Sequence, residues 1–227
     1  MNYIPLKLPS KCIPYENTDP NAIEIRPFIG EDSEILSQDK NKNIFKRFKK
    51  IIERCLRGID PGLLTMGDIV YITLWQAINS YSGKVDLEFV CEHCFKSLFK
   101  SIDLDKELNS EDLSEDYLKS QTKEIAGSEI KLHLLTLNDS IEIMERSLNN
   151  LPTTLYRNAL TMENGSTVDE NVEFLKSLPL RDINEIEKFQ DEFAYGPIMR
   201  APYMCTECKR EGEIDVPFRF ELLFSFE

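Results

Sequence analysis

The sequence predicts an α+β protein in which two β-hairpins flank a large helical insertion and follow N-terminal helices. Three observations predict this fold class. Two Cys-x-x-Cys pairs, Cys91–Cys94 and Cys205–Cys208, are separated by 110 residues. The residues beside each pair alternate between apolar and polar, which is typical of half-buried strands. Much of the remaining chain shows apolar side chains at helical spacing.

The composition indicates a globular protein with a sizeable core. Of the 227 residues, 41% are hydrophobic and 30% are charged, which suits one large domain or two small ones. No apolar run approaches the roughly 20 residues that a membrane span requires. The N-terminus lacks the basic start and apolar stretch of a signal peptide. We therefore expect a protein made in the cytoplasm that has no membrane partner.

The net charge of −13 disfavours nucleic acid as a partner. The chain nevertheless carries one basic cluster, on an amphipathic helix predicted over residues 44–57. Its members are Lys46, Arg47, Lys49, Lys50, Arg54 and Arg57. A solvated helix face explains such a cluster best. An acidic partner surface is the second interpretation, and nucleic acid is the third.

A second helix is predicted over residues 65–81, after a short strand at 23–26 and the turn at 58–62. The apolar residues of this helix recur at helical spacing and predict its buried side. They are Ile69, Ile72, Trp75, Ala77 and Ile78. Trp75 is interpreted as a core residue rather than a binding platform.

The four paired cysteines predict one structural zinc ion. Disulfides are disfavoured in a reducing cytoplasm, where two Cys-x-x-Cys pairs indicate a metal site. Each pair directs two sulfurs to one point, and two pairs complete a tetrahedral shell that suits zinc. The predicted ligands are therefore Cys91, Cys94, Cys205 and Cys208. A redox or disulfide role is the alternative, and His93 is the alternative ligand within the first pair.

The strand patterns place each cysteine pair at the tip of a hairpin, as in a zinc ribbon. A simple ribbon separates its pairs by roughly 15–20 residues, so the longer gap predicts an inserted subdomain. We expect an N-terminal extended segment with helices at 1–83 and a mainly helical insertion at 105–196. The ribbon itself is expected at 84–104 and 197–227.

The sequence contains no recognisable catalytic constellation, so no enzymatic activity and no small-molecule substrate are expected. Phosphate-binding, dinucleotide-binding, zinc-protease and serine-hydrolase motifs are all missing. Four cysteine ligands would also fill the metal shell, whereas catalytic zinc keeps an open position. The two other cysteines, Cys12 and Cys55, are interpreted as small apolar fillers.

Two further segments carry weaker predictions. Residues 104–123 are acidic and polar, which suggests a mobile surface segment. Near the C-terminus, apolar side chains alternate with mostly polar ones from Phe218 to Phe226. This pattern is typical of a strand, either an ordinary internal strand or an edge strand that pairs with a partner chain.

Several short motifs occur in an order that resembles a known family. They are Leu8-Pro9-Ser10, Ile23-Glu24-Ile25-Arg26-Pro27-Phe28, Leu64-Thr65-Met66-Gly67-Asp68, the first cysteine pair, Leu178-Pro179-Leu180-Arg181-Asp182, the second cysteine pair and Val216-Pro217 followed by the aromatic tail. Together they resemble the T4-type baseplate hub proteins of contractile-tailed bacteriophages. Only the cysteine pairs are individually specific, and the 104–123 segment has no counterpart.

The resemblance implies a structural or assembly role in the tail baseplate of the virion, among other hub and tail proteins. It implies zinc ligands at Cys91, Cys94, Cys205 and Cys208, and synthesis in the host cytoplasm.

The alternative function is a zinc-ribbon module that binds nucleic acid or a polymerase. This alternative predicts basic and aromatic residues around the cysteine pairs. Glu92, His93, Thr206 and Glu207 lie inside them, followed by Lys209 and Arg210, which is weak support.

Overall fold

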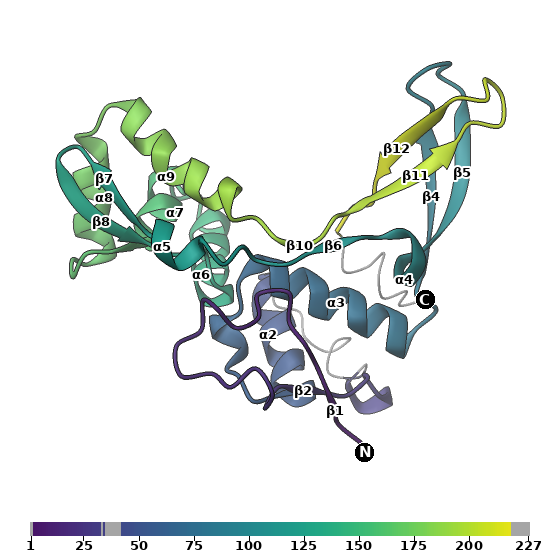
Figure 1. Cartoon of the computed structure of the whole chain (residues 1–227), viewed down its shortest axis with the longest axis horizontal. Helices are drawn as coiled ribbons and strands as arrows, with labels where there is room; N and C mark the ends of the chain where they lie inside the picture. The colour runs from purple at the N-terminus through teal and green to yellow at the C-terminus, as the bar shows by residue number, and fades with distance from the viewer. Residues whose placement is uncertain (1, 33, 35–41, 219–227) are drawn as a thin grey trace.

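The computed structural model describes residues 2–32, 34 and 42–218 and has a mixed α+β fold, as predicted (Figure 1). A helix-rich body contains the N-terminal segment, a second lobe is formed by residues between the cysteine pairs, and a β arm projects from the body. Within the described residues, no helix has the length and apolar character needed to span a membrane.

The body is built on two helices, and both were predicted. Helix α2 (Ile44–Cys55) begins at Asn43, whose side-chain oxygen accepts hydrogen bonds from two backbone N–H groups of the first turn. Helix α3 (Met66–Ser80) follows the short 3-10 helix η1 (Pro61–Leu63). A small antiparallel sheet lies beside them. Its strands, in sheet order, are β1 (Ile4–Pro5), β2 (Glu24–Ile25) and β3 (Leu56–Arg57).

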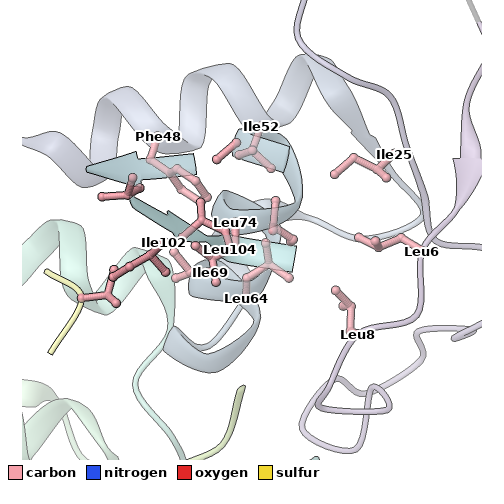
Figure 2. Packing of buried hydrophobic residues seen from close by; sticks show 14 of the residues in the cluster. Leu6, Leu8, Ile25, Phe48, Ile52, Leu64, Ile69, Leu74, Ile102 and Leu104 are labelled. Atoms are coloured by element: carbon pink, nitrogen blue, oxygen red, sulfur yellow. The ribbon is translucent and has the colours of Figure 1, made fainter. Parts of the chain in front are cut away.

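The main apolar core lies where α2, α3 and the N-terminal segment meet (Figure 2). Ile51, Ile52 and Ile72 are completely buried there. Trp75 and Ile78, predicted to be buried, only pack against the edge of this core. The core also reaches the base of the arm, because Val85 and Ile102 of its strands join the same cluster.

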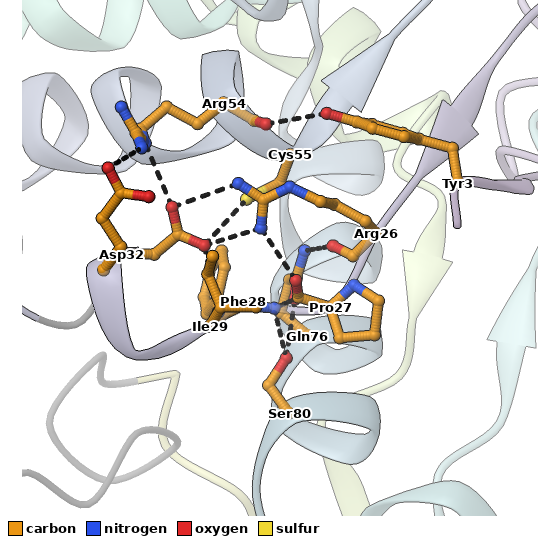
Figure 3. Close-up of polar contacts among 11 residues, drawn as sticks. Tyr3, Arg26, Pro27, Phe28, Ile29, Asp32, Arg54, Cys55, Gln76 and Ser80 are labelled. Atoms are coloured by element: carbon orange, nitrogen blue, oxygen red, sulfur yellow. Dashed lines mark hydrogen bonds and ion pairs between the residues drawn. The ribbon is translucent and has the colours of Figure 1, made fainter. Parts of the chain in front are cut away.

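A buried ion cluster joins the segment after β2 to the C-terminal end of α2 (Figure 3). The Asp32 side chain is fully buried and accepts hydrogen bonds from Arg26 Nη1 at 2.6 Å and Arg54 Nε at 3.0 Å. Burial alone would raise the pKa of Asp32, but these hydrogen bonds and that of the Ile29 backbone N–H lower it below its usual value. The Arg26 carbonyl accepts a hydrogen bond from Gln76 of α3 at 2.9 Å, so the cluster also contacts this helix.

The lobe between the cysteine pairs has its own apolar core. Phe189, Leu175 and Leu132 are buried in it. Its strands are β7 (Thr122–Ile125), β8 (Ser128–Leu132) and β9 (Met162–Glu163), and its longer helices are α6 (Leu137–Leu148), α7 (Thr154–Leu160), α8 (Val168–Lys176) and α9 (Leu180–Glu192). Helices α6 and α8 each begin with a capping box.

The acidic segment 104–123 is not the mobile surface segment that its composition suggests. It forms α4 (Leu104–Glu107), β6 (Ser110–Glu111) and α5 (Tyr117–Ser120). Strand β6 pairs with β10 (Gly196–Pro197), where the chain returns from the lobe. Three apolar side chains of this polar segment are nevertheless buried. Leu104 lies in the core of the body, and Leu113 and Tyr117 lie in the core of the lobe, so the segment is attached to both.

The arm consists of two hairpins that form separate two-stranded sheets. Strand β4 (Lys84–Val90) pairs with β5 (Ser97–Asp103), and β11 (Arg200–Met204) pairs with β12 (Glu211–Asp215). Beyond β12, Phe218 is described but lies outside any strand, and the rest of the predicted strand lies outside the described residues.

Candidate metal centre

The structure brings together the four cysteines that the sequence singled out. Each pair lies in the turn of one arm hairpin, and the four sulfurs all lie within 4.8 Å of one another. Cys91 Sγ is 3.9 Å from Cys208 Sγ, and Cys94 Sγ is 3.6 Å from Cys205 Sγ. A disulfide needs about 2.05 Å, so these thiols are free. The four thiols could hold one metal ion.

The two cysteine turns have the same backbone geometry. The Cys91 N–H donates to the Lys96 carbonyl and the Phe95 N–H donates to the Cys91 carbonyl, both at 2.9 Å. The second turn repeats this pattern around Cys205, at 2.9 and 3.0 Å. In both turns the residue after the second cysteine has a left-handed conformation, with φ of 58° at Phe95 and 59° at Lys209. This repetition explains why both pairs present their sulfurs in the same way.

The thiols differ in how readily they ionise. Burial opposes ionisation of Cys91, but the backbone N–H groups of Cys94 and His93 and the Tyr203 hydroxyl lower its pKa to about 6. The Lys96 backbone N–H favours the Cys94 thiolate, yet burial and the three neighbouring cysteines raise the pKa of Cys94 to about 12. Four thiolates this close together would repel one another, and a bound cation would offset that repulsion.

Tyr203 supports the site from β11, and sequence reasoning missed it. Its hydroxyl donates to Cys91 Sγ at 3.8 Å, and its ring contacts the Phe89 ring with centroids 4.8 Å apart. It lies opposite Gly212 in the hairpin, where an added Cβ would come within 2.7 Å of the Tyr203 ring. The inward position of Tyr203 in the alternating strand was the available signal.

The two histidines and the two other cysteines do not belong to this cluster of four thiols. His93 Nε2 is 3.1 Å from the Glu211 carbonyl oxygen, and His133 Nδ1 is 3.0 Å from the Leu134 carbonyl oxygen. Cys12 and Cys55 are buried in the body, and burial followed by a nearby carboxylate raises their pKa values to about 11 and about 12. Such thiols are poor nucleophiles at neutral pH. Across residues 2–32, 34 and 42–218, the four arm thiols are the one group with metal-site geometry.

The arrangement of donors fits a tetrahedral ion such as zinc. With Zn–S bonds of about 2.3 Å, neighbouring sulfurs of a tetrahedron lie about 3.8 Å apart. Two of the sulfur–sulfur separations, 3.6 and 3.9 Å, bracket this value, and all four sulfurs lie within 4.8 Å of one another.

Comparison with known proteins agrees with the resemblance seen in the sequence. The family model described as T4 bacteriophage base plate protein matches residues 1–225. No curated protein and no solved structure matches the chain. Because the family match covers nearly the whole sequence, the chain belongs to the T4 bacteriophage base plate protein family and is a structural component of a phage baseplate.

Proposed function

We propose that this protein is a component of the baseplate hub of a contractile phage tail, where it acts in structure or assembly. We further propose that one zinc ion, bound by Cys91, Cys94, Cys205 and Cys208, stabilises it. The observation that carries the metal proposal is the convergence of two sequence-distant cysteine pairs at one point. Membership of the baseplate family supports the location in the virion tail and contacts with other tail proteins.

The proposed zinc is structural rather than catalytic. Four thiolates fill a tetrahedral shell and leave no open position for a substrate or an activated water. The metal would close a loop of 110 residues and restrict the unfolded chain. Among the described strands, the β4–β5 hairpin and the β11–β12 hairpin form separate sheets, and no strand of one is paired with a strand of the other. The metal would therefore link two sheets that no backbone ladder joins.

The predicted domain boundaries fit this role, and we propose them as the protein's organisation. The segment at 105–196 contains the lobe core, and its two ends meet in the β6–β10 pair. Residues 84–104 and 197–227 would form the ribbon, and residues 1–83 the N-terminal part. Arm residues Val85 and Ala201 belong to the body's apolar core, which supports a rigid connection at this boundary.

A metal assay on purified chain tests the zinc site. We expect about one zinc per chain in the wild type and a loss of zinc in Cys205→Ser. The control is Cys12→Ala, which removes a thiol outside the cluster and should retain the metal. Zinc-free wild-type protein, or a Cys205→Ser variant that keeps its zinc, would contradict the proposal.

Mass spectrometry of purified particles and of assembly intermediates tests the hub role. A low, fixed copy number in particles supports a hub component, and presence only in intermediates supports an assembly role. Absence from both, combined with co-purification of nucleic acid or a polymerase, would instead favour the zinc-ribbon alternative.

A further inference from the structure

A hollow at the base of the arm has apolar walls that the described residues leave partly uncovered. It has a volume of about 440 Å³ and lies between helix α3 and the segment that leads through α4 to β6 (Figure 1). Its walls include Tyr71, Trp75 and Ile78 from α3 and Leu104 and Leu108 from the facing segment. Trp75 and Ile78, which the helical spacing predicted to be buried, are only half-buried. This face of α3 therefore has room for a further apolar partner.

Charge does not select an occupant for this hollow. Asp103 already forms an ion pair with Lys106 at 2.9 Å, and Glu107 forms one with Lys100. Asp105, which also lines the hollow, is a single exposed carboxylate, and ion pairs at exposed sites contribute little in water. An occupant is therefore held by the burial of apolar surface, which stabilises in proportion to the area removed from water.

The last described residues of the chain lie close to this hollow. The Val216 backbone N–H donates to the Met199 carbonyl oxygen at 2.9 Å, and the Val216 side chain is buried in the core of the body. Pro197, two residues before Met199, lines the hollow. Standard bond lengths and Cα spacings then place the Val216 Cα within about 15 Å of the Pro197 Cα. Phe218, the last described residue, is 39% exposed.

The residues that follow, 219–227, supply apolar side chains in a pattern that suits the hollow. We call them the C-terminal tail. Large apolar side chains occupy every second position, at Phe220, Leu222, Phe224 and Phe226. In an extended segment such side chains point to the same side, and nine residues span up to about 30 Å. The tail is therefore long enough to reach and cross the hollow, and it has an apolar side to place there.

We propose that the C-terminal tail binds, in an extended conformation, in the Trp75 hollow of its own chain. Leu222 and the phenylalanines at alternate positions on either side of it would cover Trp75 and Ile78. The bound tail would connect α3 to the acidic segment and to Pro197 of β10, all of which line the hollow. It would thus fasten the body to the β6–β10 pair, through which the chain enters and leaves the lobe. This inference does not depend on the proposed zinc ion or on the hub role.

The tail of a second copy of the chain would offer the same side chains, but the covalent connection favours the chain's own tail. Because Val216 lies near the hollow, the tail is a tethered ligand, and short tethers give effective concentrations on the order of millimolar. A second copy competes only at its concentration in solution. A different protein must also displace the tethered tail before it can bind the hollow.

Tryptophan fluorescence of the full chain tests the proposal, because Trp75 is the single tryptophan of the sequence. Leu222→Ser should shift the emission to longer wavelength and increase quenching by acrylamide, since it weakens the apolar side of the tail. Leu223→Ser is the matched control. It makes the same change in the adjacent residue, which points to the opposite side of an extended segment, and should keep the wild-type emission. Zinc content and circular dichroism should match the wild type in both variants.

A mixing experiment shows whose tail binds. Trp75→Phe protein has an intact tail and no tryptophan, so an excess of it should leave the shifted emission of Leu222→Ser protein unchanged. Recovery of the wild-type emission would assign the hollow to a second copy and overturn the proposal. Equal emission and quenching in Leu222→Ser and Leu223→Ser would overturn it as well. Phe224→Ser provides a second variant on the apolar side, and it should reproduce the shift of Leu222→Ser.

Discussion

The body and the arm of this protein are held together in different ways. In the body, α2 and α3 pack against a shared apolar core, and the buried Asp32 is neutralised by two arginines. In the arm, two separate two-stranded sheets share apolar residues such as Val85, Ile102 and Ala201 with the body's core, and no strand pair joins the two sheets among the described residues. Isolated hairpins are marginally stable in water. The arm thus depends on what joins its tips, whereas the body is stabilised by its own packing.

The largest expected effect comes from removing the metal ligands, which should affect the arm alone. Cys205→Ser or chelation should abolish the protection of β4, β5, β11 and β12 amides against hydrogen exchange. The α2 and α3 amides should stay protected, because Ile51, Ile52 and Ile72 of these helices are completely buried where α2, α3 and the N-terminal segment meet, although the same apolar cluster extends to Cys91 and Cys205. Hydrogen exchange with mass spectrometry measures both regions in one experiment. Loss of protection in α2 as well would show that the body also needs the metal.

A large loss of stability in the body is expected for Asp32→Ala. This change leaves Arg26 buried without its carboxylate partner, which costs about 3–5 kcal/mol of unfolding free energy. Zinc content should stay at the wild-type level. Denaturant unfolding measures the loss, with Asp116→Ala as the control. Asp116 pairs with Lys119 at an exposed site, where the expected change is below about 1 kcal/mol.

A smaller effect, confined to the arm, is expected for Gly212→Ala. The new Cβ would lie 2.7 Å from the Tyr203 ring that supports Cys91, so the ring or β12 must shift. Overpacking of this kind costs about 1–3 kcal/mol. We expect faster exchange of arm amides and weaker zinc retention under a chelator. Gly30→Ala, where no atom lies within 4 Å of the added Cβ, should leave both unchanged.

The smallest expected effect is a change in the acid dependence of the body's stability. The pKa of Asp32 is lowered in the folded state, so its contribution is present above its ordinary pKa and is lost as pH falls through the lowered value. Asp32→Asn should therefore flatten the stability curve below about pH 4, by up to about 1.4 kcal/mol per pH unit.

Asp68 should change the stability of the body with pH in the opposite direction to Asp32. Burial raises its pKa despite hydrogen bonds from the Ser10 backbone N–H and the Tyr15 hydroxyl. Its protonated form thus adds stability below the ordinary pKa, and this contribution disappears as pH rises through the raised value. Denaturant unfolding between about pH 3 and pH 7 distinguishes Asp32→Asn from Asp68→Asn. If the unfolding free energy of both variants changed with pH in the same way, the opposite roles given to Asp32 and Asp68 would be wrong.

Local pattern was enough to predict the fold class and the location of the candidate site. The spacing of the cysteines and the alternation around them depend only on neighbouring residues, and the structure has hairpins with cysteine turns at those positions. Helices α2 and α3 were predictable for the same reason, because apolar periodicity reflects the geometry of a single helix.

The acidic segment shows where local pattern fails. The composition of residues 104–123 predicted a surface segment, yet the side chains of Leu104, Leu113 and Tyr117 are buried and attach it to the body and the lobe. Three apolar side chains without regular spacing give no periodic signal. Their burial depends on the surfaces that the body and the lobe present to them.

By itself, the sequence determined the α+β class, the cysteine turns, the two body helices and, through its motifs, the resemblance to baseplate proteins. Only the tertiary structure decided that Asp32 meets Arg26 and Arg54, that Tyr203 supports Cys91, and that the two hairpins form separate sheets. The physical reason is the range of the interactions. Periodicity and turn geometry act within a few residues, whereas these contacts join side chains whose proximity is fixed by the path of the whole chain.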